Sequence, residues 1–171
     1  MEMQEIIGDY QAFFGDISDH LQTLGVDISK YPLSHLGIKF ASFEEYEHAR
    51  DAIKKHTAAF AENEHNGRPI AVMQLRTPLH LSRGCSVDIL ELMPPKPDNK
   101  YPTGLEHLGV VIGAALEEFA ATHQSVITGR QDQGPLCKPF FILLDTGKRV
   151  KFYDLALKDV IEKEGKSFIS L

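Results

Sequence analysis

The chain of 171 residues, 43% hydrophobic and 25% charged, has the composition of a globular protein with one substantial core or two small fused modules. Its net charge of −6 argues against a nucleic-acid partner, because phosphate binding needs clustered Lys and Arg. No apolar run approaches the roughly 20 residues that span a bilayer, and residues 1–5 lack the basic region of a signal peptide, so we expect a cytoplasmic protein without a membrane partner.

The first part of the chain has a helical pattern. Apolar residues recur at helical spacing from residue 3 to about residue 25, where Gly25 is placed to end a helix. Tyr31-Pro32 then stops any further helix. We therefore predict an N-terminal helical extension over residues 1–33, with one helix over residues 3 to about 25.

A short phrase follows that the chain uses twice, HLGIKF at residues 35–40 and HLGVVI at residues 107–112. In an extended strand, side chains alternate between two faces, so each copy collects its apolar residues on one face and its histidine and glycine on the other. Two strands of one pattern, each presenting a histidine away from the core, indicate two copies of one structural unit that face a shared site.

The first copy opens a β-α-β-β-β pattern, which we assign to a first module of residues 34–97. Ser42 with Glu45 three residues later forms a capping box that starts a helix ending near residue 55. Asn66-Gly67 is a strong hairpin signal between two of the strand-like runs, which cover residues 58–64, 68–75 and 87–92. On the last run, Glu91 has the parity that places it on the same face as His35.

The second copy opens the same pattern after a proline-rich connector at residues 94–102. We predict a second module over residues 98–171, with a helix and three strands followed by a short terminal helix, at residues 114–121, 125–128, 138–144, 149–155 and 157–163. The predicted fold class is α+β: two paired β-α-β-β-β modules form a curved mixed sheet around a central cleft, as one compact fold.

The repeated histidines and Glu91 form a candidate metal site. A lone histidine beside an apolar strand is more often a hydrogen-bonded structural residue, but the repetition of His35 and His107 favours a common role. Two imidazoles and a carboxylate with open positions suit a divalent ion such as Zn, Ni, Mn, Fe or Co. Such an ion can polarise a substrate carbonyl or bind vicinal oxygens.

This arrangement resembles the vicinal oxygen chelate superfamily, which includes glyoxalases, extradiol dioxygenases and fosfomycin resistance proteins, and within it more closely the bacterial YecM family. The resemblance covers most of the chain after the first helix and rests on Ser34-His35-Leu36, Asn66-Gly67-Arg68-Pro69-Ile70, Leu90-Glu91-Leu92, Tyr101-Pro102, Glu106-His107 and Val150-Lys151-Phe152. It implies a metal-binding protein without a settled reaction, related to isomerases and oxidoreductases. The ligands that it implies are His35, Glu91 and His107.

One position departs from the superfamily pattern. Many relatives carry a fourth ligand, usually Glu, four residues after the turn glycine of the last strand, and that count from Gly147 reaches Lys151. A protonated lysine has no lone pair and repels a cation. The site therefore has three protein ligands plus water, or Tyr153 adds its phenolic oxygen. Lys151 itself either neutralises an anionic substrate or is a solvated strand residue.

Arg68 is a further substrate-binding candidate, because its planar fork can clamp a carboxylate. The alternative for Arg68 is a salt bridge that pins the hairpin. The leading interpretation is a metal-dependent isomerase, lyase or dioxygenase that acts on a small, oxygen-rich, anionic molecule. The alternatives are a non-catalytic module that binds or sequesters a small ligand and has a vestigial metal site, and a structural or regulatory protein. A homodimer is left open.

Overall fold

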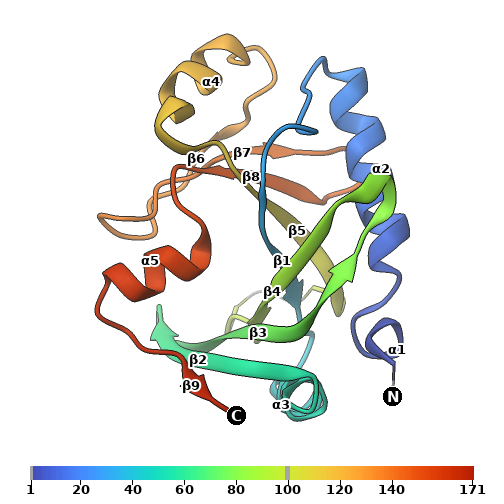
Figure 1. The fold of residues 1–171 in the computed structure, drawn as a ribbon, viewed down its shortest axis with the longest axis vertical. Coiled ribbons are helices and arrows are strands. Elements are labelled where there is room, and N and C mark those ends of the chain that lie inside the picture. Colours follow the sequence, from blue (N-terminus) through green and yellow to red (C-terminus); the bar gives the residue numbers. More distant parts are fainter. Residues whose placement is uncertain (1, 99–100) are drawn as a thin grey trace.

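One mixed β-sheet organises the computed structural model, which describes residues 2–98 and 101–171. Its nine strands within these residues are β1 (Leu33–Lys39), β2 (Thr57–His65), β3 (Arg68–His80), β4 (Ser86–Met93), β5 (Gly104–Val111), β6 (Gly129–Arg130), β7 (Phe140–Leu143), β8 (Arg149–Tyr153) and β9 (Ile169–Ser170). Their order across the sheet is β6-β7-β8-β5-β1-β4-β3-β2-β9, so the two halves of the chain meet at β1 and β5 (Figure 1).

Two units with the same element order make up this sheet. The first runs β1, α3 (Phe43–Lys54), β2, β3 and β4, and the second runs β5, α4 (Leu116–Thr122), β6, β7 and β8. β1 pairs in parallel with β4, β5 pairs in parallel with β8, and antiparallel pairing of β1 with β5 joins the units. The sheet is not closed. The predicted α+β fold of two paired β-α-β-β-β modules is confirmed.

The apolar parity of the repeated phrase faces the main core. Leu36 and Ile38 of β1, and Leu108 and Val110 of β5, are fully buried and belong to the same cluster as residues of α2 (Tyr10–Thr23), α3 and α4. Burying each such side chain contributes about 1.5–3 kcal/mol, so this face is strongly fixed. The histidines of the phrase consequently project from the opposite face, which we call the inner face.

The prediction of one N-terminal helix is wrong, because the segment forms α1 (Met3–Ile7) and α2 instead. Gly8 leaves the helical conformation with φ 89° and ψ −176°. The side chain of Asp9 then caps α2 by accepting a hydrogen bond from the N–H of Ala12 (2.9 Å). The apolar spacing continues across the break, which is why periodicity alone does not reveal it.

The predicted strand at residues 125–128 is also wrong, since these residues form a turn and the approach to β6. The N–H groups of Val126 and Ile127 both donate to the carbonyl of His123, which closes the turn after α4. Both side chains still pack against the main core. The apolar pattern here therefore reflects burial without a strand. In the predicted connector, residues 99–100 lie outside the described residues.

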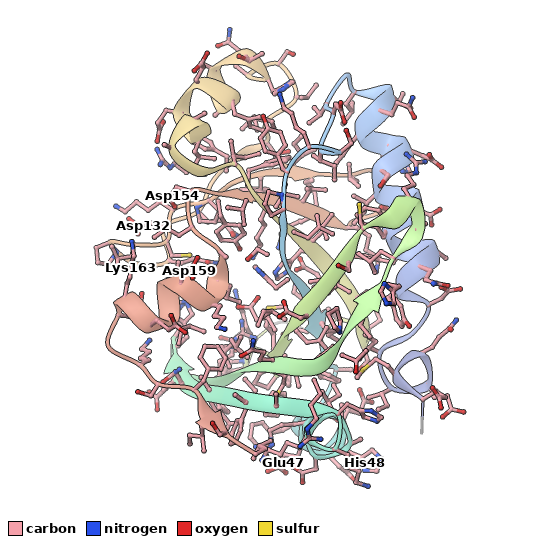
Figure 2. The ribbon with its side chains drawn as sticks, in the orientation of Figure 1. Glu47, His48, Asp132, Asp154, Asp159 and Lys163 are labelled. Carbon is pink, nitrogen blue, oxygen red and sulfur yellow. The ribbon has the colours of Figure 1, made fainter. Side chains whose placement is uncertain are left out.

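One local signal acts as predicted and a second does so in part. Asn66 and Gly67 have φ angles of 52° and 76°, as a tight hairpin turn between β2 and β3 requires. Ser42 caps α3 by accepting from the N–H of Glu45 (3.1 Å), but the second bond of the predicted capping box is missing, because the Glu45 carboxylate accepts from the hydroxyl of Thr103 instead. Glu47 and His48 lie on the exposed side of α3, away from the sheet (Figure 2).

The C-terminal segment crosses from the second unit to the first. Helix α5 (Leu157–Lys163), at the predicted position, packs Leu157 and Ile161 against Val72 and Ile89 on the inner face of the first unit. Strand β9 then pairs with β2 at the sheet edge (Figure 1). α5 therefore covers part of the inner face. Within the described residues, no helix has the length and apolar character needed to cross a membrane.

Candidate metal centre

The two histidines of the repeated phrase lie on the paired central strands. In the register of β1 and β5, His35 is opposite Gly109 and Gly37 is opposite His107. A Cβ on residue 109 would lie 2.6 Å from Cε1 of His35, and a Cβ on residue 37 would overlap the His107 ring. Each imidazole can therefore occupy the inner face only because the residue opposite it on the other strand is glycine.

Glu91 joins the histidines from the neighbouring strand β4, where it pairs with Gly37. Nε2 of His35 lies 3.0 Å from Nε2 of His107, and Oε2 of Glu91 lies 3.1 Å from Nε2 of His107 and 3.7 Å from Nε2 of His35. Atoms at these separations share a point about 2 Å from each, the usual length of a bond from zinc to nitrogen or oxygen. The structure thus brings the three predicted ligands together.

A β-bulge precedes each histidine. The register of β1 and β5 shifts between Leu33 and His35, which leaves Ser34 as an extra residue on β1. It shifts again between Gly37 and Ile38, where Glu106 is the extra residue on β5. A bulge redirects side chains that strict alternation would send to the other face. Ser34 and Glu106 consequently contact the histidines that follow them.

These two residues bind the outer nitrogens of the imidazoles. Oγ of Ser34 lies 2.8 Å from Nδ1 of His35, and Oε2 of Glu106 lies 2.5 Å from Nδ1 of His107. Metal-bound histidines commonly donate their second N–H to such a partner, which fixes the ring and leaves the other nitrogen for the ion. Ser34 also accepts from the N–H of Leu157 (2.8 Å), so the start of α5 is tied to the site.

Glu106 is held as an anion by two cations. Its Oε1 accepts from Nζ of Lys39 (3.0 Å) and from Nη1 of Arg149 (2.9 Å). Burial raises the pKa of Glu106, but the hydrogen bond from His107 and the charge of Lys39 outweigh it and hold the pKa below its usual range. The carboxylate therefore stays ionised beside the imidazole at neutral pH.

Two of the candidate ligands, His35 and Glu91, are in the protonation states that bind a cation. Burial lowers the pKa of His35 to about 3, so its ring is neutral at pH 7. For Glu91, burial raises the pKa, but the hydrogen bond with His107 is among the effects that reverse this and bring the pKa below its usual range. The site therefore offers a neutral imidazole and a carboxylate.

Lys151 occupies in the second unit the place that Glu91 occupies in the first. Lys151 on β8 pairs with Gly109, as Glu91 on β4 pairs with Gly37. Its side chain is 5% exposed, so the alternative of a solvated strand residue is wrong. Burial lowers the pKa of Lys151, and the nearby carboxylates oppose this shift. No hydrogen bond or ion pair joins its ammonium group to another described residue.

The other two candidate residues lie at different depths. Tyr153 is 2% exposed and packs against His35, with a distance of 5.4 Å between the ring centroids. It is not part of the cavity wall. Arg68 does line the cavity, where its Nη1 donates to the carbonyl of Pro94 and to the hydroxyl of Tyr101 (3.2 Å). Arg68 thus pins the hairpin to the connector through neutral oxygens, and no described carboxylate forms a salt bridge with it.

A cavity of about 450 Å³ opens over the inner face between the two units. Of the three candidate metal ligands, Glu91 lines this cavity. Helix α5 forms one side of the cavity through Leu157 and Ile161. Although the whole chain is acidic, cationic side chains outnumber carboxylates on this wall; they are Lys39, Arg68, Lys96, Arg149, Lys151 and Lys166. The cavity is therefore suited to an anionic molecule.

Sequence reasoning missed Ser34 and Glu106 as partners of the histidines, because it assumed strict alternation along the strands. The signal that was available is position: each directly precedes a histidine of the repeated phrase. It also missed Lys39 and Arg149, which form ion pairs with Glu106 and keep it ionised. Gly37 and Gly109 were visible in the phrase, but their purpose requires the register between the two strands.

Comparison with known proteins identifies the family. A family model described as YecM protein matches residues 2–140. Protein YecM from Escherichia coli (strain K12) is 21% identical over 179 residues, which cover 95% of this chain and 94% of that protein. A solved structure described as Protein EC4020 has a TM-score of 0.76 at 21% identity, covers 95% of this chain and 92% of its own, and has the same fold. A weaker likeness, with a TM-score of 0.44 at 14% identity, joins 71% of this chain to 40% of the 2,3-dioxygenase LapB from Pseudomonas sp. KL28. Because the family model spans most of the chain, the protein belongs to the YecM family.

Proposed function

We propose that the protein binds one divalent metal ion through His35, Glu91 and His107. This metal centre, of the vicinal oxygen chelate type, acts on a small, oxygen-rich anion. The observation that carries the proposal is the convergence of three ligand atoms within 3.7 Å from strands of both units. The glycines opposite the imidazoles and the bulges at Ser34 and Glu106 support it, since both features serve to present the ligand nitrogens.

The residues around the centre have separable roles. A bound ion would polarise a carbonyl or hold vicinal oxygens of the ligand. Ser34 and Glu106 would each hold one imidazole in its orientation through a hydrogen bond to Nδ1. Lys151 would place a positive charge beside the anionic group of the ligand. Helix α5 would keep water from this part of the inner face. These roles suit isomerase, lyase and dioxygenase chemistry, which all require a bound oxygen to be polarised or held.

Metal analysis tests the first half of the proposal. The protein is purified without added metal, and its content of Zn, Ni, Mn, Fe and Co is measured by mass spectrometry. We expect about one ion per chain, and no ion in His35→Ala. Metal-bound protein is then screened with 2-oxo and 2-hydroxy acids for binding and turnover. Absence of every divalent ion, together with no uptake when these ions are supplied, would overturn the proposal.

A non-catalytic binding module is the second candidate, and the lysine at the place of a fourth ligand favours it. In that case the cavity would hold its anion without an ion. The test is ligand affinity before and after removal of metal with a chelator. Equal affinities and no turnover would support the binding module, whereas loss of binding on chelation would support the metal centre.

A further inference from the structure

The guanidinium group of Arg68 lines the cavity and has N–H donors that no described residue uses. Its Nη1 is held by Pro94 and Tyr101, which fixes the plane of the guanidinium group. Its Nε is buried and has no partner among the described residues, and none of them bonds to its Nη2. A guanidinium group held in this way, with no carboxylate paired to it, is a strong binder of a carboxylate or phosphate.

The cations of the cavity fall into two groups. Lys39 and Arg149 share Glu106, and Lys166 pairs with Glu164 at 3.1 Å. In contrast, Arg68, Lys96 and Lys151 form no ion pair with any carboxylate of the described residues. A second guanidinium nitrogen on this wall, Nε of Arg149, is likewise buried without a partner. The wall of the cavity thus has positive charge left for more than one anionic group.

Lys151 and Arg68 lie on opposite sides of the candidate ligands. Lys151 is level with His35, because both flank Gly109 across the sheet. Glu91 is level with Gly37, two residues further along β1, and Pro94, which holds Arg68, is three residues beyond Glu91 in the same direction. Three residues of extended chain span about 10 Å. The backbone positions of Lys151 and Pro94 are therefore well separated along the sheet, which favours two separate anionic groups on the ligand.

We propose that the ligand is an elongated dianion with an anionic group at each end of the cavity. This rests on the proposed function, because one end carries the oxygens that meet the metal beside Lys151. The other end is a carboxylate or phosphate bound by the guanidinium group of Arg68. The ligand class is a 2-oxo or 2-hydroxy acid with a terminal carboxylate or terminal phosphate.

Matched pairs of acids test the second anionic group. Calorimetry on metal-bound protein compares 2-oxoglutarate with 2-oxopentanoate, and 2-oxoadipate with 2-oxohexanoate, so that each pair differs in the terminal carboxylate alone. We expect the dianion of at least one pair to bind more than tenfold more tightly. 3-Phosphoglycerate, read against glycerate, shows whether a terminal phosphate is preferred to a carboxylate. Equal affinity within all three pairs would overturn the inference.

Variants locate the effect. Arg68→Gln should remove the advantage of the dianion while leaving the monoanion unchanged, and Lys151→Gln should weaken both. Arg68→Lys keeps a charge without the fork, so it should retain only part of the advantage and serves if Arg68→Gln fails to fold. Arg76→Gln is the matched control, because Arg76 is exposed and donates to the carbonyl of Lys55 outside this cavity. An advantage that survives in both Arg68 variants would contradict the role of Arg68.

Failure of the inference is distinguishable from failure of the proposed function. If metal binds and the monoanions bind as tightly as the dianions, the second subsite is wrong and the metal centre stands. If no divalent ion binds, the proposed function itself is wrong.

Discussion

The imidazole of His107 occupies the space that a Cβ on Gly37 would fill, and the same relation holds between His35 and Gly109. The spacing of histidine and glycine within the repeated phrase is therefore a packing requirement between two strands. It places both rings on the inner face without widening the β1 and β5 pair.

Gly37→Ala should displace the His107 ring and weaken both folding and metal binding. Forcing a methyl group into a filled site typically costs 1–3 kcal/mol. We expect a lower urea midpoint and metal affinity reduced at least tenfold. Gly15→Ala is the control, because a Cβ on Gly15 of α2 has Ser82 as its neighbour at an ordinary 3.7 Å. Helix propensity should make this control neutral or slightly stabilising. Equal effects of the two variants would refute the packing argument.

Glu106→Gln tests the outer partner of His107. The amide keeps the shape but loses the charge that holds Nδ1–H, and changes of this kind commonly lower metal affinity by 10–100-fold. Glu117→Gln is the matched control for Glu106→Gln. Glu117 also pairs with an arginine, Arg130, but it lies exposed on α4. Metal affinity measured by competition with a chromophoric chelator should fall in the first variant alone. An unchanged affinity in Glu106→Gln would mean that the 2.5 Å contact does not tune the site.

The sequence predicted the strands that carry the site better than the connections between them. Alternation along the repeated phrase placed the two histidines on one face, because Leu36, Ile38, Leu108 and Val110 are fully buried on the other. Alternation along the last strand of the first module placed Glu91 on the same face as the histidines. The contacts of Ser34 and Glu106 with the histidines were not predicted, because a β-bulge breaks the alternation and depends on the partner strand. The break between α1 and α2 at Gly8 was not predicted for a related reason. Apolar spacing indicates which side of a helix is buried, and α1 and α2 both bury their apolar side in the main core.

Acid should destabilise the metal-free protein from about pH 6.5 downward. Burial lowers the pKa of His35 to about 3, whereas the unfolded chain binds that proton near 6.5. Between these values the unfolded state holds the extra proton, so the free energy of unfolding falls as pH falls, by up to about 1.4 kcal/mol per unit for one site. Above pH 6.5 the contribution is complete. The lowered pKa values of Glu91 and Glu106 should steepen the loss below about pH 4.5.

Urea titrations at fixed pH measure this dependence. His35→Gln should flatten the slope between pH 6.5 and 5, because the residue that excludes the proton is gone. His48→Gln, on the exposed side of α3, should keep the slope of the parent. A parent protein whose stability is constant over this range would show that His35 accepts a proton in the folded state.

Lys151→Glu should convert the second unit to the pattern of the first. The new carboxylate would face the site from the position equivalent to Glu91, so metal affinity should rise. Binding of anionic acids should be lost, because a negative charge replaces the ammonium group. Lys158→Glu on α5 makes the same charge change outside the cavity wall and should alter neither affinity by more than about 0.5 kcal/mol. If Lys151→Glu leaves metal affinity unchanged, residue 151 does not reach the ion.

The most direct test of the metal centre is calorimetric titration of chelator-treated protein with Zn²⁺ and Mn²⁺ at neutral pH. We expect one ion per chain for the parent and for His48→Ala. The affinity should be lower by orders of magnitude for His35→Ala, Glu91→Ala and His107→Ala, because a three-ligand site has no redundancy. No binding by the parent, or equal binding by all five proteins, would contradict it.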